Sequence, residues 1–300
     1  MSRRYQLKRE LSYLPNGGKD KQMYVKLEMY TTGSCGQLEK LTNRTKPLHN
    51  VQFPARFFHL EHPTEGHILV DTGYATHFRT ATSRFPYKLY AILTPIHFSD
   101  EQSAASQLQR RGIQPSEISK ILITHFHADH IAGLKDFPNA TFLCSRRGYE
   151  SVRGQSGLLA LKKAFIPSLL PDDFESRLSF IEDYAVSQDS SIGQQLAVFE
   201  TEIYDIFHDG TVVAFDLSGH AEGQMGFLCR AEQRQVLLAA DGAWDSAAIR
   251  DNSPPMRVTS LILSDRIEYL ATLHKLHQFH ITQPTVQLIP FHCREVEGLE

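Results

Sequence analysis

The sequence predicts an α/β protein that folds as one domain with a helical insertion. Two short apolar runs, at residues 121–123 and 142–144, are typical of strands that are covered on both faces. Residues 145–194 change to a helical spacing of apolar side chains, and strand-like patterns return over residues 196–240. No repeat or linker divides the chain, so we treat residues 1–300 as a single domain in which residues 145–194 form an insertion and a candidate lid.

The first half of the chain contains a predicted hairpin that leads into an acidic turn. Turn residues at 64–66 separate two strand-like segments, and the second of these runs directly into Asp71-Thr72-Gly73. The elements expected in this half are strands at 24–30, 53–60 and 67–70, a polar loop from Thr31 to Asn50, and a helix at 101–111.

The second half combines a predicted β-meander with a capped helix. Ser264 or Asp265 can cap this helix, and Glu268 stands where a capping-box partner is expected. The elements expected in this half are strands at 196–207, 212–217, 224–229, 236–240 and 286–289, and a helix at 265–279.

Composition and charge are those of an ordinary globular protein. The 31 Lys and Arg residues against 34 Asp and Glu give a net charge of −3. The broad positive field that nucleic-acid binding needs is therefore absent, and a small-molecule partner is expected. No apolar run approaches a membrane span, and no apolar stretch follows the basic N-terminus as it would in a signal peptide. The four cysteines are scattered without CxxC spacing, which favours free thiols in a reducing cytoplasm.

Metal-binding residue types are concentrated in the segment HFHADH, which follows the apolar run at 121–123. Side chains alternate along an extended strand, so His125 and His127 point the same way and can bind one ion together. If the chain then turns into a helix, Asp129 and His130 reach a second position beside the first. Two cations held in this way can lie about 3.5 to 4 Å apart and share one hydroxide. The density of the motif disfavours the alternative of a polar loop whose histidines only form hydrogen bonds.

In the order of its motifs, the chain resembles the metallo-β-lactamase superfamily. The resemblance rests on Asp71-Thr72-Gly73, the HxHxDH run, His220 in Ser218-Gly219-His220, Asp241 after a predicted strand, and His292 after the last one. It implies a four-layer αββα sandwich with a metal site along one edge. It also implies two Zn²⁺ ions as cofactors, with iron or manganese as alternatives. The implied ligands are His125, His127 and His220 for the first ion, Asp129, His130 and His292 for the second, and Asp241 as a bridge between them.

Three acidic residues have further expected roles. The resemblance implies that Asp71 orients a ligand from outside the metal site. Asp129 is expected to pass a proton to the leaving group as well as to bind metal. Asp241 has a rival interpretation as the N-cap of a helix over residues 244–249. The metal pair implies a hydrolase in which a hydroxide that bridges the ions attacks a carbonyl.

Within the superfamily, the pattern is closest to the N-acyl homoserine lactonase-like group. The 54 residues from Asp71 to His125 match the long insertion of that group. Its apolar side chains are candidates for a pocket or for a homodimer contact, namely Phe85, Tyr87, Tyr90, Ile92 and Leu93. Trp244 stands where those lactonases carry a tyrosine that helps to bind the substrate carbonyl, so it is a candidate substrate contact.

A lactone or another acyl ester is therefore the leading substrate class. The alternatives are a thioesterase similar to glyoxalase II and a mononuclear iron sulfur dioxygenase. A binding module with purely structural metals is the least favoured, because structural zinc is usually closed by four protein ligands.

Overall fold

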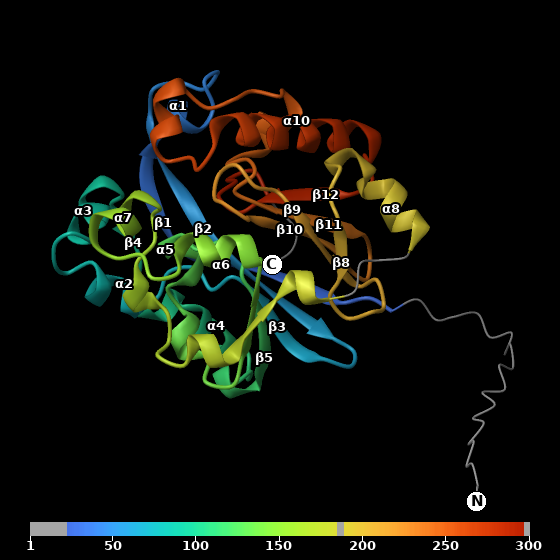
Figure 1. Ribbon diagram of the computed structural model, residues 1–300, viewed down its shortest axis with the longest axis horizontal. Coiled ribbons are helices and arrows are strands. Elements are labelled where there is room, and N and C mark those ends of the chain that lie inside the picture. The colour runs from blue at the N-terminus through green and yellow to red at the C-terminus, as the bar shows by residue number, and fades with distance from the viewer. Residues whose placement is uncertain (1–22, 185–188, 297–300) are drawn as a thin grey trace, which may run out of the picture.

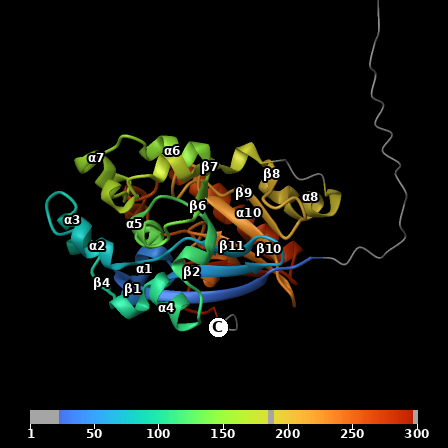
Figure 2. The same cartoon turned by 90° about the horizontal axis from the view of Figure 1, so that it is seen from below.

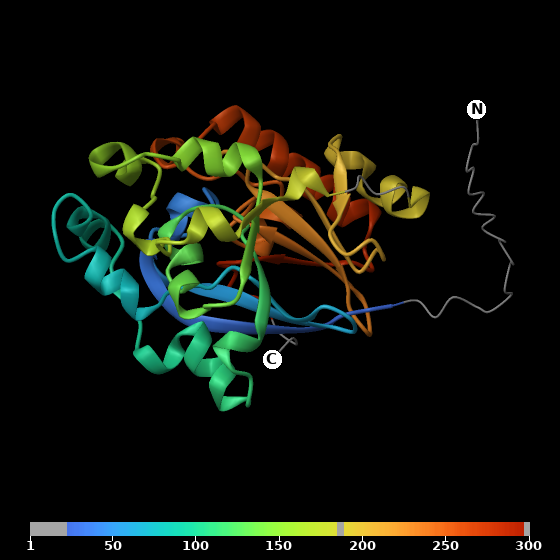
Figure 3. The same ribbon diagram turned by 60° about the horizontal axis from the view of Figure 1, so that its bottom comes forward.

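The computed structural model describes residues 23–184 and 189–296, which form two β-sheets packed face to face with helices outside (Figures 1 and 3). In these residues the first sheet has seven strands, in the order β4 (Ile96–His97), β1 (Lys26–Leu38), β2 (Asn50–His62), β3 (Gly66–Val70), β5 (Ile118–Leu122), β6 (Thr141–Cys144) and β7 (Leu178–Phe180). The second sheet has five, in the order β12 (Gln287–Pro290), β11 (Gln235–Ala240), β10 (Met225–Arg230), β9 (Val212–Asp216) and β8 (Ile203–Asp205). The αββα sandwich expected from the motifs is confirmed.

Most helices are short and cover the outer faces of the two sheets. They are α1 (Glu39–Thr42), α2 (Thr76–Ala81), α3 (Lys88–Leu93), α4 (Ala104–Arg110), α5 (Ala128–Ile131), α6 (Arg146–Val152), α7 (Gly157–Lys162), α8 (Ser190–Leu196), α9 (Ser246–Arg250) and α10 (Arg266–Thr282). Helices α2, α3 and α7 lie at one end of the molecule, and α8 lies at the other (Figures 1 and 2). None of the helices in the described part of the chain is long and apolar enough to cross a membrane.

Alternation along the strands divides the core into layers. On β2, Phe57 packs toward the helices that cover the seven-stranded sheet, whereas Phe58 packs between the two sheets. Ile121 and Leu122 on β5 divide in the same way. A third apolar layer, which includes Leu276, lies between the five-stranded sheet and α8, α9 and α10. Each of these buried side chains contributes about 1.5–3 kcal/mol. The sandwich therefore fixes the strand ends from which the site loops start.

The first strand is longer than the sequence predicted. The polar loop expected from Thr31 is wrong, because β1 continues to Leu38 and pairs with both β2 and β4. The pairing register shifts between Thr31 and Ser34, where Gly33 has a φ of +120°. A Cβ on Gly33 would lie 2.5 Å from the carbonyl oxygen of His97. The glycine thus marks a bulge in a continuing strand, although the same residue type also marks loops.

The strand expected at residues 196–207 is also wrong over most of its length. Helix α8 extends to Leu196, and only Ile203–Asp205 forms a strand. The apolar side chains of Ile192, Leu196 and Phe199 are spaced as on one face of a helix, and all three pack into the layer beneath α10. The other meander strands and the last strand are confirmed to within a residue or two.

Side-chain caps set the start of two predicted helices. Asp265 caps α10 by accepting hydrogen bonds from the backbone N–H groups of Ile267 and Glu268. Of the two expected caps, Ser264 and Asp265, the structure therefore has the second. The side chain of Glu268 pairs instead with Arg147. The helix expected at 101–111 begins later, because Ser103 caps α4 and a separate helical turn precedes it.

The segment expected as a helical insertion contains α6, α7 and several helical turns. It also contains β7, which pairs parallel to β6 and extends the seven-stranded sheet. Its role as a lid stays a prediction.

Gly219 allows the loop that carries His220 to pack on the first turn of α10. Its φ is +125°, and a Cβ there would lie 2.2 Å from the backbone nitrogen of Tyr269. We expect Gly219→Ala to lower the free energy of unfolding by about 3 kcal/mol or more, because the substitution adds backbone strain to a steric clash. The control is Gly193→Ala in α8, where a Cβ meets nothing within 4 Å and a gain of about 0.5–1 kcal/mol is expected. Urea unfolding measures both changes, and equal stability of the two variants would contradict this account.

Candidate metal centre

The motif residues lie in loops that follow strands of both sheets. The HxHxDH loop follows β5, and His220 lies in the turn between β9 and β10. Asp241 follows β11 directly, and His292 comes two residues after the end of β12. Strands β11 and β12 are parallel neighbours, and Ala240 is paired with Pro290 at their carboxyl ends. This register brings Asp241 and His292 to the same edge of the sheet.

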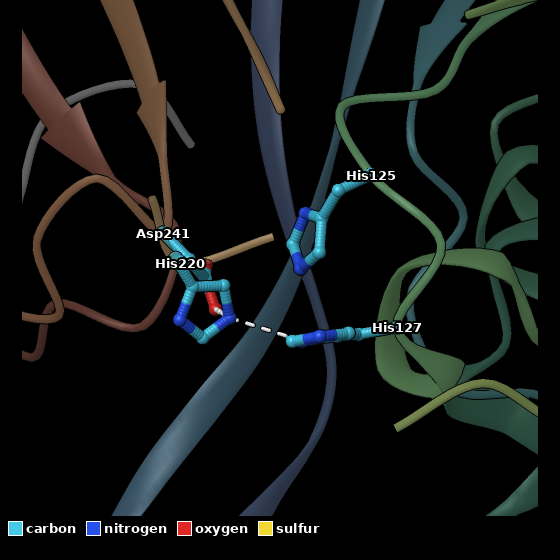
Figure 4. Close-up of side chains that lie close together, drawn as sticks. All are labelled: His125, His127, His220 and Asp241. Carbon is cyan, nitrogen blue, oxygen red and sulfur yellow. Dashed lines mark hydrogen bonds and ion pairs between the residues drawn. The ribbon is translucent and has the colours of Figure 1, made fainter. Parts of the chain in front are cut away.

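Four of these side chains form a first cluster, in which one ligand atom from each lies within 4.8 Å of the others. Figure 4 shows the side chains of His125 and His127, from the HxHxDH loop, pointing toward those of His220 and Asp241. The Nε2 atom of His220 lies 3.0 Å from Nδ1 of His127 and 3.1 Å from Oδ2 of Asp241. Three imidazoles and a carboxylate at this spacing are a donor set typical of zinc.

Asp129, His130 and His292 form a second cluster beside the first. One carboxylate oxygen of Asp129 lies 3.4 Å from Nε2 of His292. Asp241 also reaches this cluster, because its two oxygens lie 3.5 Å from Nε2 of His130 and 3.2 Å from Nε2 of His292. The Asp241 carboxylate therefore lies between the two clusters and faces both.

The residues present fit a pair of metal ions. Among the described residues, the buried atoms without a hydrogen-bond partner include Nε2 of His125, Nε2 of His130 and Oδ1 of Asp241. Buried polar atoms are rarely left unsatisfied, because desolvation without a partner costs about 1–3 kcal/mol for each group. Metal ions would provide the missing partner for several of these atoms at once.

The opposite ring nitrogens of three histidines are held by the protein. The Nδ1 atom of His130 lies 2.6 Å from the carboxylate of Asp71, and Nδ1 of His292 donates to the carbonyl oxygen of Pro54 at 2.8 Å. The Nδ1 atom of His125 lies 3.0 Å from the hydroxyl of Thr124. These contacts fix the imidazole rings so that Nε2 points into the clusters. The sequence indicated Asp71 for this role but missed Thr124 and Pro54.

Charge and burial shift the pKa values of three side chains in the first cluster. Burial lowers the pKa of His125 and His127 well below that of a free imidazole. Burial alone would raise the pKa of Asp241, but the surrounding histidines, above all His292, hold it well below its usual range. Neutral imidazole and ionised carboxylate are the forms that bind metal.

Comparison with known families agrees with this geometry. The family model described as "Metallo-beta-lactamase superfamily" matches residues 59–278. The chain belongs to this superfamily. The N-acyl homoserine lactonase AttM of Azorhizobium caulinodans is 28% identical over 194 residues, which are 64% of this chain and 66% of that protein. The AttM of Agrobacterium fabrum is 26% identical over the same shares. The matched segment thus spans just under two thirds of the length of these curated relatives.

Solved structures share the fold of this superfamily member. An N-acyl homoserine lactone hydrolase with the product N-hexanoyl-L-homoserine bound at its catalytic metal centre has a TM-score of 0.68 and 21% identity, covering 91% of this chain and 95% of that one. A quorum-quenching N-acyl homoserine lactone lactonase has a TM-score of 0.66 and 22% identity, covering 92% and 96%.

A cavity of about 440 Å³ opens over the two clusters, and we call it the apolar arm of the site. Much of its wall is apolar, and the lining includes Leu41, Phe53, Leu93 and Trp244 beside Asp129 and Asp241. Tyr90 also lines it, and its hydroxyl donates a hydrogen bond to Oδ1 of Asp129 at 3.5 Å. Cys35 completes one side, and burial raises the pKa of its thiol to about 12, so the thiol stays protonated.

The apolar residues named from the sequence between Asp71 and His125 include some that line the apolar arm and some that do not. Tyr90 and Leu93 line the apolar arm, whereas Phe85 and Ile92 are exposed and lie outside it. The hydroxyl of Tyr87 accepts a hydrogen bond from the backbone N–H of Gly157, and this bond joins the segment between Asp71 and His125 to α7. A homodimer contact through the exposed side chains stays a prediction.

Trp244 lies beside the first cluster, and its ring meets that of His220 edge to face, with centroids 5.3 Å apart. It is mostly buried and lines the apolar arm.

The rival interpretation of Asp241 as a helix N-cap is wrong. Helix α9 is capped by Asp245, whose carboxylate accepts a hydrogen bond from the backbone of Ala248 at 2.6 Å. The side chain of Asp241 is directed into the clusters instead.

Proposed function

We propose that this protein is a dinuclear zinc hydrolase that cleaves a lactone or another acyl ester. The position of Asp241 carries the proposal, because one buried carboxylate lies within 3.5 Å of histidines from both clusters. The similarity to N-acyl homoserine lactonases supports an acyl substrate.

Each ion would take its ligands mainly from one cluster. The first ion would be held by His125, His127 and His220, the second by Asp129, His130 and His292, and both by Asp241. When bound, such a pair lowers the pKa of water toward neutrality and polarises a carbonyl oxygen.

Other properties of the chain suit it to acyl transfer to water. The apolar arm offers a dry surface for an acyl group, and Trp244 would contact the substrate there. Asp129 faces the same space and is about nine-tenths buried. We propose that Asp129 also holds the proton that the leaving oxygen takes up when the bond to the acyl carbon breaks.

A substrate panel tests this proposal. Initial rates would be measured with N-hexanoyl homoserine lactone, a hexanoyl ester, a hexanoyl thioester and a phosphodiester. We expect turnover of the lactone or the ester, loss of that turnover on chelation, and its return on addition of zinc. Faster turnover of the thioester would favour the thioesterase alternative. Absence of all hydrolysis by zinc-loaded protein, with oxygen consumption by iron-loaded protein, would contradict the hydrolase.

A further inference from the structure

A second cavity meets the apolar arm at the metal centre. It also measures about 440 Å³, and the two cavities share five residues in their walls, namely His127, Lys162, His220, Leu261 and Ile262. Besides apolar side chains, its lining carries Ser151, Gln155 and two lysines, so we call it the polar arm. The site therefore has two arms of different chemistry.

The chain around Lys162 is held against both loops that carry the first cluster. Lys162 is the last residue of α7. Two residues later, the carbonyl oxygen of Ala164 accepts a hydrogen bond from the backbone of Ala128 in the HxHxDH loop, at 3.0 Å. Lys163 forms an ion pair with Glu222, which lies two residues after His220. These contacts place the backbone of Lys162 where the two loops meet.

In the part of the chain that the structure describes, the charge of Lys162 has no protein partner. Glu222 neutralises Lys163 on the wall of the polar arm. Within residues 23–184 and 189–296, by contrast, no carboxylate pairs with the ammonium group of Lys162 and no acceptor takes a hydrogen bond from it. An uncompensated cation on a wall common to both arms attracts a negative group that enters the site.

We propose that the polar arm binds the leaving group of the substrate, and that Lys162 recognises an anionic group, such as a carboxylate, on that leaving group. The inference rests on the proposed function. In the hydrolysis, the bond between the acyl carbon and the leaving oxygen breaks, and the oxygen of water forms the new bond to that carbon. One proton of water goes to the leaving oxygen, and the other is released by the carboxylic acid product. With the acyl group in the apolar arm and the leaving group in the polar arm, this inference selects, from the two proposed substrate classes, an ester whose alcohol carries an acid.

Two esters of equal shape test the role of Lys162. The hexanoyl esters of 4-hydroxybenzoate and 4-hydroxybenzamide differ mainly by one negative charge. For the zinc-loaded protein we expect KM to be about fivefold lower for the carboxylate ester, because Lys162 is exposed and its ion pair is partly screened. Lys162→Met should remove this preference, and Lys162→Arg should keep it. Lys135→Met is the matched control, because Lys135 is an exposed lysine that lines neither arm.

Binding of the free leaving groups separates failure of this inference from failure of the proposed function. Calorimetry with 4-hydroxybenzoate should show weaker binding to Lys162→Met than to the unsubstituted protein, although both keep their zinc. Equal KM values for the two esters, or a preference that survives Lys162→Met, would overturn the role of Lys162 even if both esters are hydrolysed. Hydrolysis of no ester or lactone, together with weaker 4-hydroxybenzoate binding in Lys162→Met, would contradict the proposed function and support the anionic subsite.

Discussion

Asp241→Ala is expected to lower kcat/KM by about a thousandfold or more, because the substitution removes a carboxylate that both clusters share. His130, His220 and His292 would each lose a carboxylate oxygen within 3.5 Å. We therefore expect the variant to hold at most one tightly bound ion. Zinc titration followed by initial rates measures both effects.

Asp245→Ala is the matched control for this experiment. Asp245 lies four residues further along the chain and is also buried, but it caps α9 instead of facing the clusters. Its loss should lower the free energy of unfolding by about 1 kcal/mol and leave the metal content unchanged. Two bound zinc ions and unchanged turnover in Asp241→Ala would contradict the shared-ligand assignment.

Two substitutions of Asp71 are expected to have different effects, one mainly on folding and the other mainly on metal binding. The carboxylate is fully buried and accepts hydrogen bonds from the backbone N–H and the hydroxyl of Thr124 and from Nδ1 of His130, at 2.6 to 2.8 Å. Asp71→Ala would leave all three donors unpaired and should lower the free energy of unfolding by about 3–5 kcal/mol.

Asp71→Asn is expected to fold but to bind the second ion poorly. Asparagine tolerates the φ of +58° at this position, and its amide oxygen can still accept from the backbone of Thr124. Its NH₂ group then faces Nδ1 of His130, so the imidazole must accept there and carry its proton on Nε2, the atom that faces the second cluster. Zinc affinity at this cluster should fall about 10- to 100-fold.

Thermal unfolding and zinc titration of the two Asp71 variants measure these effects separately. Wild-type zinc affinity in Asp71→Asn would show that Asp71 does not set the tautomer of His130. Rotation of the new side-chain amide by 180° would place its oxygen toward His130. This orientation is disfavoured, because the NH₂ group of the asparagine would then face the backbone N–H of Thr124.

The sequence predicted those parts of the site that depend on short-range patterns. The HxHxDH loop was recognisable because an apolar strand precedes it and because His125 and His127 alternate with Phe126. That the loops of Asp71, Asp241 and His292 meet the HxHxDH loop was implied by the resemblance to the metallo-β-lactamase superfamily, which rests on the order of the motifs. The recognition of the HxHxDH loop depends on local periodicity alone.

Other parts depend on contacts that no local pattern encodes. The carbonyl of Pro54 fixes His292 across 238 positions of sequence, and a backbone carbonyl leaves no mark in residue type. The continuation of β1 beyond Gly33 depends on the bulge and on pairing with β4. The apolar side chains from Ile192 to Phe199 suit a helix or a strand, and their packing beneath α10 decides for a helix.

Metal content of the purified protein tests the central claim most directly. Plasma mass spectrometry would be applied to protein produced without added metal and to its His127→Ala variant, which lacks one imidazole of the first cluster. The account predicts about two zinc ions per chain in the unsubstituted protein and at most one in the variant, with lactone or ester turnover only in the former. One iron ion per chain without hydrolysis would contradict the account.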